Sequence, residues 1–538
     1  MLNKAEQWAN HDLDSGYQAK VRLWIDENNT GELNSAFNGP LTFGTAGLRG
    51  EVGPGESRMN LSTVAQATYG VAQWLNEKMS NPKVVVGCDA RHGSSEFYDI
   101  TCQVLSAAGC TVVALPKKLP TPVTAFAVRF FKADAAVMIT ASHNPAKDNG
   151  YKLYLGGRSV NSEFEDGVQL VSPADKEIAE LISQAFFADQ IPLDTNNIHY
   201  SGDEIIDEYV KAAYSLSEKT ARKPRIVITG LHGVGATLLK KVLTTAGFTN
   251  VIDVPQQNTP DPEFPTVSFP NPEEQGALNL AIETAKENQA DLIIAVDPDA
   301  DRCSVAIPND ENEWVQLSGD TMGSLLGEYL ARKHPGVGTF ANSIVSSSLL
   351  QKIAEKHSIK FENTLTGFKW IGRVPHLAYG YEEAIGFCVN PQKVRDKDGI
   401  TAGLVFAVIA SEYDIWELLC ELDATYGAYV TKPLTIRLDS SQQVHELSQK
   451  MNKQLPVEIA GSRVEETFNL SDGWKGLPPT TGFMFITEYG DKIVVRPSGT
   501  EPKLKCYMET IHPIRSEAEK RMNKINESMN NYFDSLIS

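Results

Sequence analysis

The chain has 538 residues, of which 68 are Asp or Glu and 49 are Lys or Arg, so its formal net charge is −19 at pH 7. With 42 % apolar and 22 % charged residues, the composition excludes a disordered chain, and the length fits about three or four globular domains. The acidic balance disfavours bulk nucleic-acid binding, because counterion release from phosphates needs clustered Lys and Arg.

The sequence gives no sign of membrane insertion or secretion. Its longest apolar stretches, such as residues 403–410, fall short of the roughly 20 residues that a spanning helix needs. The first residues, MLNKAEQWANHDLD, lack the apolar segment of a secretory signal. Seven cysteines without a C-x-x-C pair argue against a disulfide framework or a thiolate zinc site. We expect a cytoplasmic protein without membrane or nucleic-acid partners.

Hydrophobic patterning in the first half predicts two β-α-β-α-β units. The first has strands at 83–88, 110–115 and 135–140 with helices at 94–108 and 121–131; the second has strands at 225–229, 251–254 and 291–296 with helices at 236–246 and 278–288. This alternation builds a parallel sheet.

A third α/β unit and a different tail follow. Helices are predicted at 320–332, 347–357 and 400–413, and the tail has strands at 433–438, 482–487, 492–496 and 503–508 with helices at 441–453 and 515–533. We therefore predict an α/β fold of three similar α/β domains, 1–200, 201–313 and 314–425, plus a smaller C-terminal α+β domain, 426–538.

The motif T-A-S-H-N-P at residues 140–145 directly follows a predicted strand. Ser142 would lie just past the carboxyl end of that strand, where open α/β sheets bind ligands. It is either a nucleophilic or phosphorylated serine or part of a polar turn closed by Asn-Pro. The neighbouring His143 does not make a serine-hydrolase triad, because the chain has no G-x-S-x-G elbow here.

A tight acidic loop separates two apolar runs. Asp297, Asp299 and Asp301 would repel one another unless a cation lies among them, and a hard divalent ion such as Mg²⁺ meets that need. An EF-hand is excluded, because Arg302 and Pro308 stand where that loop requires Gly and Glu. The remaining alternative is a solvated acidic turn.

Two further loops follow predicted strands. Residues 496–500, R-P-S-G-T, precede Lys503 and Lys505 and hold the parts of a phosphate cradle, although Ser-Gly turns are common. Residues 230–235, G-L-H-G-V-G, lack the G-x-G-x-x-G order and indicate a structural turn.

Taken together, these loops resemble those of the α-D-phosphohexomutase family, the phosphoglucomutases and phosphomannomutases, over essentially the whole chain. Segments 43–50, 366–370, 380–387 and 395–399 are most similar to the branch that includes phosphoglucomutase-2 and phosphopentomutase-type enzymes. The resemblance implies that the four domains surround a central cleft. It also implies that Ser142 is carried as phosphoserine and that Asp297, Asp299 and Asp301 hold Mg²⁺ together with a phosphoserine oxygen.

The resemblance also assigns candidate roles. Lys152, Lys369 and Arg302 are candidates for general base and acid, or are purely electrostatic. Arg49 and Arg91 steady the phosphoserine region or the substrate, or form interdomain salt bridges. The expected substrate-binding residues are His143, Glu382, Ala384, Arg496, Ser498, Gly499, Thr500 and Lys505. Ala384 departs from the E-x-S sugar loop of better-known phosphoglucomutases, so the loss of a hydroxyl should alter sugar preference.

We expect a mutase that interconverts hexose 1-phosphate and 6-phosphate, glucose first, with glucose 1,6-bisphosphate as activator. A phosphopentomutase or phosphomannomutase with the same mechanism stays open. So do a phosphohydrolase and a non-catalytic sugar-phosphate sensor. The chain is expected to be a monomer or a weak homodimer.

Overall fold

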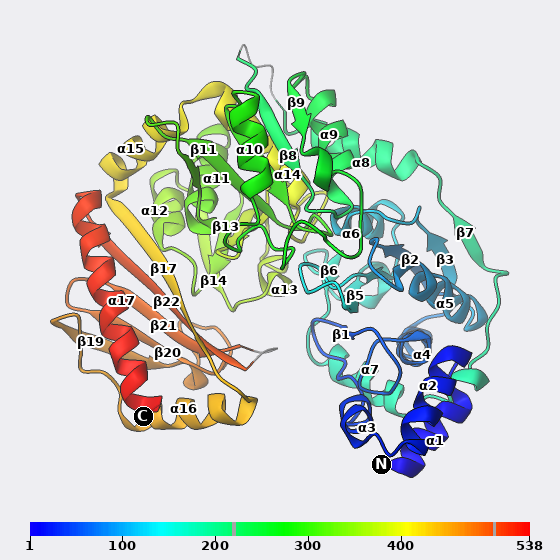
Figure 1. Ribbon diagram of the computed structural model, residues 1–538. Coiled ribbons are helices and arrows are strands. Elements are labelled where there is room, and N and C mark those ends of the chain that lie inside the picture. Colours follow the sequence, from blue (N-terminus) through cyan, green and yellow to red (C-terminus); the bar gives the residue numbers. More distant parts are fainter. Residues whose placement is uncertain (218–221, 499–501, 538) are drawn as a thin grey trace. The chain divides into compact units, whose positions relative to one another are not determined.

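The computed structural model describes residues 1–217, 222–498 and 502–537 (Figure 1). The chain forms two compact units. Unit 1 comprises Met1–Ser318 and Gly372–Glu412, and unit 2 comprises Gly319–Ile371 and Tyr413–Ser538.

The first sheet of unit 1 has the strand order β1-β5-β4-β2-β3-β7, and β6 pairs with β5. Its strands are β1 (Leu48–Glu51), β2 (Lys83–Cys88), β3 (Thr111–Ala114), β4 (Ala135–Ile139), β5 (Asp148–Leu155), β6 (Val168–Gln169) and β7 (Ile198–Tyr200). Strands β2, β3, β4 and β7 are parallel, as the β-α-β pattern predicts, whereas β1 and β5 add an antiparallel edge that patterning did not predict.

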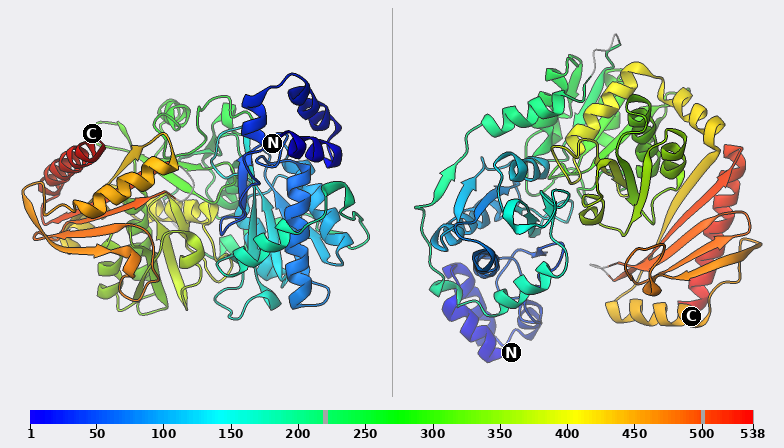
Figure 2. Two further views of the ribbon diagram at one scale, coloured as in Figure 1. Left: turned by 90° about the horizontal axis from the view of Figure 1, so that it is seen from below. Right: turned by 180° about the vertical axis from the view of Figure 1, so that it is seen from behind.

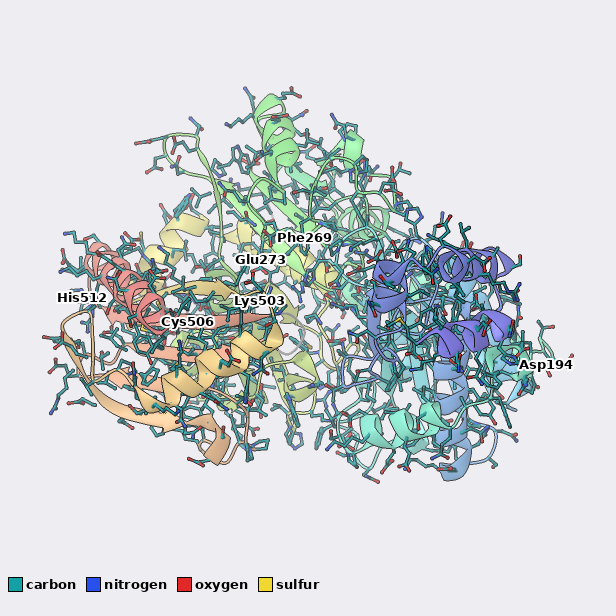
Figure 3. All side chains as sticks on the ribbon, turned by 60° about the horizontal axis from the view of Figure 1, so that its bottom comes forward. Asp194, Phe269, Glu273, Lys503, Cys506 and His512 are labelled. Atoms are coloured by element: carbon teal, nitrogen blue, oxygen red, sulfur yellow. The ribbon has the colours of Figure 1, made fainter. Side chains whose placement is uncertain are left out.

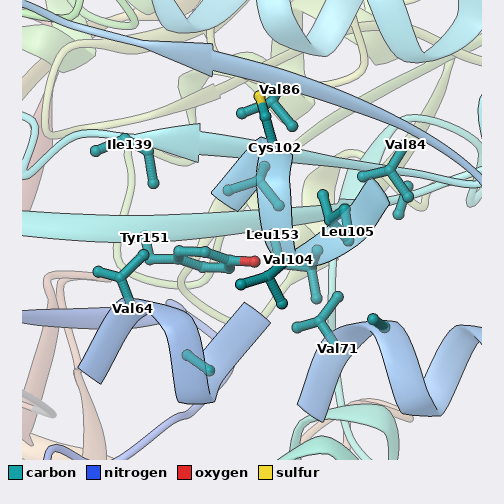
Figure 4. Packing of buried hydrophobic residues seen from close by; sticks show 14 of the residues in the cluster. Val64, Val71, Val84, Val86, Cys102, Val104, Leu105, Ile139, Tyr151 and Leu153 are labelled. Carbon is teal, nitrogen blue, oxygen red and sulfur yellow. The ribbon is translucent and has the colours of Figure 1, made fainter. Parts of the chain in front are cut away.

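Helices cover both faces of this sheet. They are α4 (Leu61–Lys78), α5 (Ser94–Ala107), α6 (Thr121–Phe130) and α7 (Ala174–Ser183). Alternate strand side chains point to opposite faces, and Figure 4 shows Val64 and Val71 of α4 packed toward Tyr151 and Leu153 of β5. On the other face α6 approaches so closely that a Cβ on Gly87 would lie 2.3 Å from Thr124 Oγ1. The sheet is therefore buried on both faces.

Three N-terminal helices precede this sheet and were not predicted from the sequence. They are α1 (Leu2–His11), α2 (Ser15–Asp26) and α3 (Thr30–Ala36), which lie together in dark blue in Figure 2. Asp14 and Asn29 cap α2 and α3, because their side chains accept hydrogen bonds from backbone N–H groups of the first turns. Trp24 and Leu33 lie in their separate core.

The second sheet of unit 1 has the order β12-β11-β10-β8-β9. Its strands are β8 (Ile226–Thr229), β9 (Val251–Asp253), β10 (Leu292–Val296), β11 (Cys303–Pro308) and β12 (Trp314–Gln316), and the accompanying helices are α8 (Glu204–Tyr214), α9 (Gly235–Thr245), α10 (Asn279–Glu287) and α14 (Gly399–Glu412). Residues 399–411 of α14 are all buried, which explains their uninterrupted apolar sequence. A hairpin of β15 (Leu377–Glu382) and β16 (Gly386–Cys388) also belongs to unit 1.

Unit 2 begins with α/β elements: α11 (Gly319–Lys333), β13 (Thr339–Ser343), α12 (Leu349–Lys356), β14 (Lys360–Thr364) and α13 (Phe368–Ile371). After α15 (Ile415–Tyr426) comes an antiparallel sheet of order β17-β22-β21-β20-β19-β18. Its strands are β17 (Ala428–Arg437), β18 (Glu458–Ile459), β19 (Ser462–Asn469), β20 (Phe483–Thr487), β21 (Lys492–Pro497) and β22 (Lys503–His512). Helices α16 (Ser441–Lys453) and α17 (Arg515–Ile537) pack on one face of this sheet (Figure 1). This confirms the predicted α+β tail.

Short 3₁₀ turns complete the fold: η1 (Gly157–Ser159), η2 (Ala188–Gln190), η3 (Pro255–Gln257) and η4 (Leu470–Asp472). None of the described helices combines the length and the apolarity needed to cross a bilayer.

One buried carboxylate in unit 2 provides a stability test. Asp491 is fully buried and accepts hydrogen bonds from Thr487 (2.8 Å), Thr510 (2.6 Å) and the Arg521 guanidinium (2.5 Å). Asp491→Ala leaves these donors without their acceptor, so we expect a loss of about 3 kcal/mol in the free energy of unfolding, measured by urea denaturation. The exposed Asp472→Ala should change it by less than about 0.5 kcal/mol. Equal effects would contradict the assignment.

Candidate active site

Ser142 lies at the carboxyl end of β4, in the position that the sequence predicted. Its backbone is left-handed (φ 55°), and its N–H donates to Thr140 Oγ1 at 2.9 Å. The side chain is buried, and its hydroxyl donates to Asp297 Oδ2 at 3.1 Å. Ser142 and His143 do lie in a turn before Asn144-Pro145, but the Ser142 hydroxyl is buried in it and faces a buried carboxylate of another strand-end loop.

The three aspartates of the loop between β10 and β11 are buried together. Their ligand atoms all lie within 4.8 Å of one another, and each residue is at most 1 % exposed. Asp299 Oδ1 and Asp301 Oδ1 have no hydrogen-bond partner. Buried acceptors without a donor and an all-oxygen ligand set fit a hard cation, so this cluster could hold a metal ion. Burial excludes a solvated acidic turn.

Three cationic side chains surround the triad. Lys152 on β5 donates from Nζ to Asp299 Oδ2 at 2.7 Å and to Asp301 Oδ2 at 2.8 Å, and Lys397 Nζ lies 3.2 Å from Asp301 Oδ2. Arg302 Nε lies 3.8 Å from Asp301 Oδ1. Charge is therefore largely balanced inside the site.

The balance of charge sets the protonation of these groups. Burial alone would lower the pKa of Lys152, but the carboxylates of Asp299 and Asp301 outweigh it and raise that pKa. For Arg302, too, burial is outweighed, by Asp301 and Asp297, and its pKa is raised. Both side chains stay charged at neutral pH. The pKa of Asp301 is lowered, because Lys152 and Lys397 together overcome the effect of burial.

Arg49 and His143 flank the serine. Arg49 on β1 donates from Nη1 to Asn144 Oδ1 at 3.0 Å, and His143 Nδ1 lies 3.3 Å from Ser142 Oγ. Burial lowers the pKa of His143, and the charges of Arg302 and Arg49 lower it further, so the imidazole is neutral at neutral pH.

The predicted sugar loop, residues 380–387 with Glu382 and Ala384, lies next to the acidic loop, residues 297–302. Ile385 O accepts a hydrogen bond from Cys303 N at 3.1 Å, and Arg302 forms an isolated bridge with Gly386. The carboxylate of Glu382, at the end of β15, helps to raise the pKa of Arg302, whereas Ala384 is partly buried in the hairpin turn. Glu273, shown with Phe269 on the segment before α10 in Figure 3, also acts on Arg302.

Lys397 was missed as a site residue, although its segment 395–399 was part of the resemblance. Both flanking aspartates are buried and bonded: Asp396 accepts from Tyr154 Oη at 2.7 Å, and Asp398 accepts from Tyr209 Oη at 2.7 Å. The signal was a run of alternating charges directly before an apolar helix. Thr121, whose Oγ1 donates to Asp299 Oδ2 at 2.5 Å, had no comparable signal.

The remaining predicted site residues belong to unit 2. Lys369 lies on α13, and Arg496 at the end of β21 donates to Thr366 Oγ1. Ser498 N donates to Lys503 O at 2.8 Å, and Lys505 on β22 pairs across the sheet with Arg496. Gly499 and Thr500 lie outside the described residues. The structure thus groups Arg496, Ser498 and Lys505 in unit 2.

Unit 1 brings together the serine, the acidic triad, Lys152, Arg302, Arg49, His143 and the sugar loop. A buried serine hydroxyl beside a candidate metal site and fixed cations, on an α/β scaffold, defines an enzyme of phosphoryl transfer.

Comparisons with known proteins identify the family to which this enzyme belongs. Family models described as phosphoglucomutase/phosphomannomutase alpha/beta/alpha domains I, II and III match residues 40–187, 207–310 and 318–426. A probable phosphomannomutase of Haemophilus influenzae is 41 % identical over 88 % of this chain and 97 % of that protein. Human phosphopentomutase is 33 % identical over 97 % and 93 %, and Staphylococcus haemolyticus phosphoglucomutase is 32 % identical over 94 % and 95 %.

A crystal structure of a putative phosphomannomutase from Thermus thermophilus has the same fold, with a TM-score of 0.70 over 91 % of this chain and 99 % of that one, at 23 % identity. The chain belongs to the phosphoglucomutase/phosphomannomutase family, which confirms the resemblance. It is therefore an isomerase of the phosphosugar-mutase type, and its substrates are phosphosugars.

The G-L-H-G-V-G turn, residues 230–235, contacts the acidic loop at Pro298, which fits its predicted structural role. Val234 N donates to Pro298 O at 2.8 Å, and a Cβ on Gly233 would lie 2.2 Å from Pro298 Cα. Only glycine allows this approach. The turn therefore fixes the residue between two of the three aspartates.

Gly233→Ala should displace the acidic loop, because its Cβ would overlap the backbone of Pro298. If the triad holds a divalent ion, its affinity, measured by calorimetry with added Mg²⁺, should fall about 10-fold or more, as it does when groups that orient metal ligands are lost. Gly31→Ala, in α3, is the control, since its Cβ would lie an ordinary 3.7 Å from Oδ1 of Asn29, the N-cap residue of that helix. Wild-type affinity in Gly233→Ala would contradict the role of the turn.

Proposed function

We propose that this enzyme interconverts hexose 1-phosphate and hexose 6-phosphate, glucose first, through a phosphoserine at Ser142. The observation that carries the proposal is the contact between Ser142 Oγ and Asp297 Oδ2, 3.1 Å, at the edge of the buried acidic triad. A serine placed there can exchange a phosphoryl group next to a candidate metal site and fixed cations.

Mg²⁺ is the proposed metal, held by Asp297, Asp299 and Asp301 together with a phosphoserine oxygen. Two of these carboxylates keep buried oxygens without a donor, and all the ligand atoms are oxygen, as Mg²⁺ prefers. When bound, the ion would neutralise charge on the transferring phosphoryl group.

The chain's own residues would handle the remaining charge and protons. As the phosphoryl group leaves Ser142, its P–O bond to Oγ breaks, a P–O bond to the attacking sugar hydroxyl forms, and the proton of that hydroxyl leaves to a base. Lys152 and Arg302 hold their protons at neutral pH, which suits charge stabilisation and return of a proton to Oγ. The sugar then carries two phosphates, as in glucose 1,6-bisphosphate, and it turns over within the site. Ser142 Oγ next takes the other phosphoryl group, whose P–O bond to the sugar breaks, so that the isomeric monophosphate is released and the phosphoserine is restored.

Substrate-binding roles are proposed for residues of each unit taken by itself. Glu382 would accept hydrogen bonds from sugar hydroxyls, with His143 and Arg49 beside the serine. In unit 2, Arg496, Ser498 and Lys505 would bind the phosphate that is not transferred, with Lys369 as a further cation; Gly499 and Thr500 keep their predicted roles in the same loop.

A phosphopentomutase is the second candidate. Ala384 removes a hydroxyl that could discriminate between sugars, and human phosphopentomutase matches 97 % of the chain at 33 % identity. The choice between hexose and pentose affects the sugar loop and leaves the phosphoryl chemistry unchanged.

The first experiment ranks the sugars. The purified protein is incubated with Mg²⁺, a trace of glucose 1,6-bisphosphate and glucose 1-phosphate, and glucose 6-phosphate is coupled to NADPH formation. Mannose 1-phosphate and ribose 1-phosphate are assayed in parallel, and EDTA should abolish each signal. We expect glucose to be fastest. Turnover of ribose phosphate alone would assign a pentomutase, release of inorganic phosphate a phosphohydrolase, and silence with all three would overturn the proposal.

Ser142→Ala removes the hydroxyl that carries the phosphoryl group. We expect mutase activity to fall at least about a thousand-fold while the melting temperature stays within a few degrees of wild type. Ser215→Ala, on an exposed serine at the end of α8, is the matched control and should keep full activity. Near-normal turnover by Ser142→Ala would exclude the phosphoserine mechanism.

A further inference from the structure

Arg91 follows β2 and is almost completely buried, at 4 % exposed. Its guanidinium binds backbone carbonyls of the serine loop, residues 142–148. Nη2 donates to Ser142 O at 2.7 Å and to Asn144 O at 2.6 Å, while Nη1 donates to Pro145 O at 2.8 Å and to Asp148 O at 3.1 Å. The planar fork of one side chain therefore spans the whole loop.

This loop has a conformation that needs support. Ser142 is left-handed, a region that residues other than glycine rarely adopt and that persists only where the surroundings hold it. The Ser142 N–H donates a hydrogen bond to Thr140 Oγ1, and the Ser142 carbonyl accepts one from Arg91 Nη2. The direction of the Ser142 side chain is thus set from both of its peptide groups.

Arg91 is itself held in place. Its backbone N–H donates to Asp89 Oδ1 at 3.0 Å, and Asp89 Oδ1 also accepts from Ser94 Oγ at 2.5 Å. Its Nε lies 3.5 Å from Asp89 Oδ2, longer than a hydrogen bond. The short contacts of the guanidinium are therefore those to the loop carbonyls.

Residues 263–269, a segment of unit 1 between β9 and α10, cover Arg91. The Phe264 ring, 3 % exposed, lies 4.9 Å from the guanidinium carbon. The next residue back, Glu263, contacts His92 Nε2 at 2.5 Å, and the Phe269 ring centroid lies 6.1 Å from that of His143. This cover keeps water from the guanidinium and so strengthens its hydrogen bonds.

We infer that Arg91, covered by Phe264, is a positioning residue that fixes Ser142 for phosphoryl transfer by binding the carbonyls of its loop. Arg91 contacts the Ser142 backbone and not its hydroxyl, so it acts through the geometry of the serine. The inference rests on the proposed function in one respect, that Ser142 carries the phosphoryl group.

Arg91→Lys keeps the charge but cannot reach four carbonyls with one ammonium group. We expect kcat, and the single-turnover rate of transfer from phosphoserine to sugar phosphate, to fall about 10- to 100-fold with KM within about threefold of wild type, because small misplacement of a reacting group is costly. Hydrogen exchange of the amides at 140–150 should become faster. Phe264→Leu, which removes the ring alone, should lower kcat by a smaller factor.

Arg158→Lys is the matched control. The Arg158 guanidinium binds Asp134, directly before β4, and the backbone carbonyls of Ser80 and Asn81, and none of these residues belongs to the serine loop. It should keep the wild-type kcat and the wild-type exchange at 140–150, whatever its melting temperature.

Wild-type kcat in a folded Arg91→Lys would overturn the inference, and so would a loss of melting temperature with unchanged transfer and exchange rates. If Arg91→Lys does not fold, wild-type kcat and exchange in Phe264→Leu overturn it. Failure of the proposed function is distinguishable: the wild-type protein would then show no phosphoserine and no mutase activity, while exchange at 140–150 in Arg91→Lys would still report whether Arg91 holds the loop.

Discussion

The structure of unit 1 depends on burying three carboxylates within a few ångströms of one another. Burial and the two neighbouring carboxylates raise the pKa of Asp297, so a cluster of this kind depends on cations close to it. Three cations lie beside the aspartates: Lys152 comes from β5, Lys397 from the segment before α14, and Arg302 from the acidic loop itself. The serine loop and the sugar loop are then fixed by their contacts with the same aspartates or with Arg302.

The charge of the site contrasts with that of the chain. A protein with a net charge of −19 must attract an anionic phosphosugar locally, and under the proposed function the buried cations near Ser142 would do so, because their fields are weakly screened there. The sequence had already required this local attraction. What it did not contain was the arrangement, in which a single carboxylate oxygen, Asp301 Oδ2, contacts two ammonium groups.

Prediction from sequence succeeded where the signal was local. Apolar runs with helical or strand spacing located β2 to β4, β8 to β10 and most of the tail, and strand-end loops located Ser142 and the acidic triad. It failed where the signal was long-range. The antiparallel strand β1 and the roles of Thr121 and Lys397 depend on contacts with residues far away in the chain, which spacing cannot reveal. Helices α1 to α3, with few buried residues each, gave only a weak periodic pattern.

The shared oxygen of Asp301 also bears on how the chain assembles. Lys152 is 149 residues before Asp301, and Lys397 comes from a segment that returns to unit 1 after the chain has passed through part of unit 2. Such long loops must close before these contacts form, which costs chain entropy, so we expect the site to form late in folding. During synthesis the aspartates are made before Lys397, and until that residue arrives their loop lacks one of its counter-charges. The cluster of charges around Asp301 can therefore be complete only after the last segment of unit 1, Gly372–Glu412, has been synthesised.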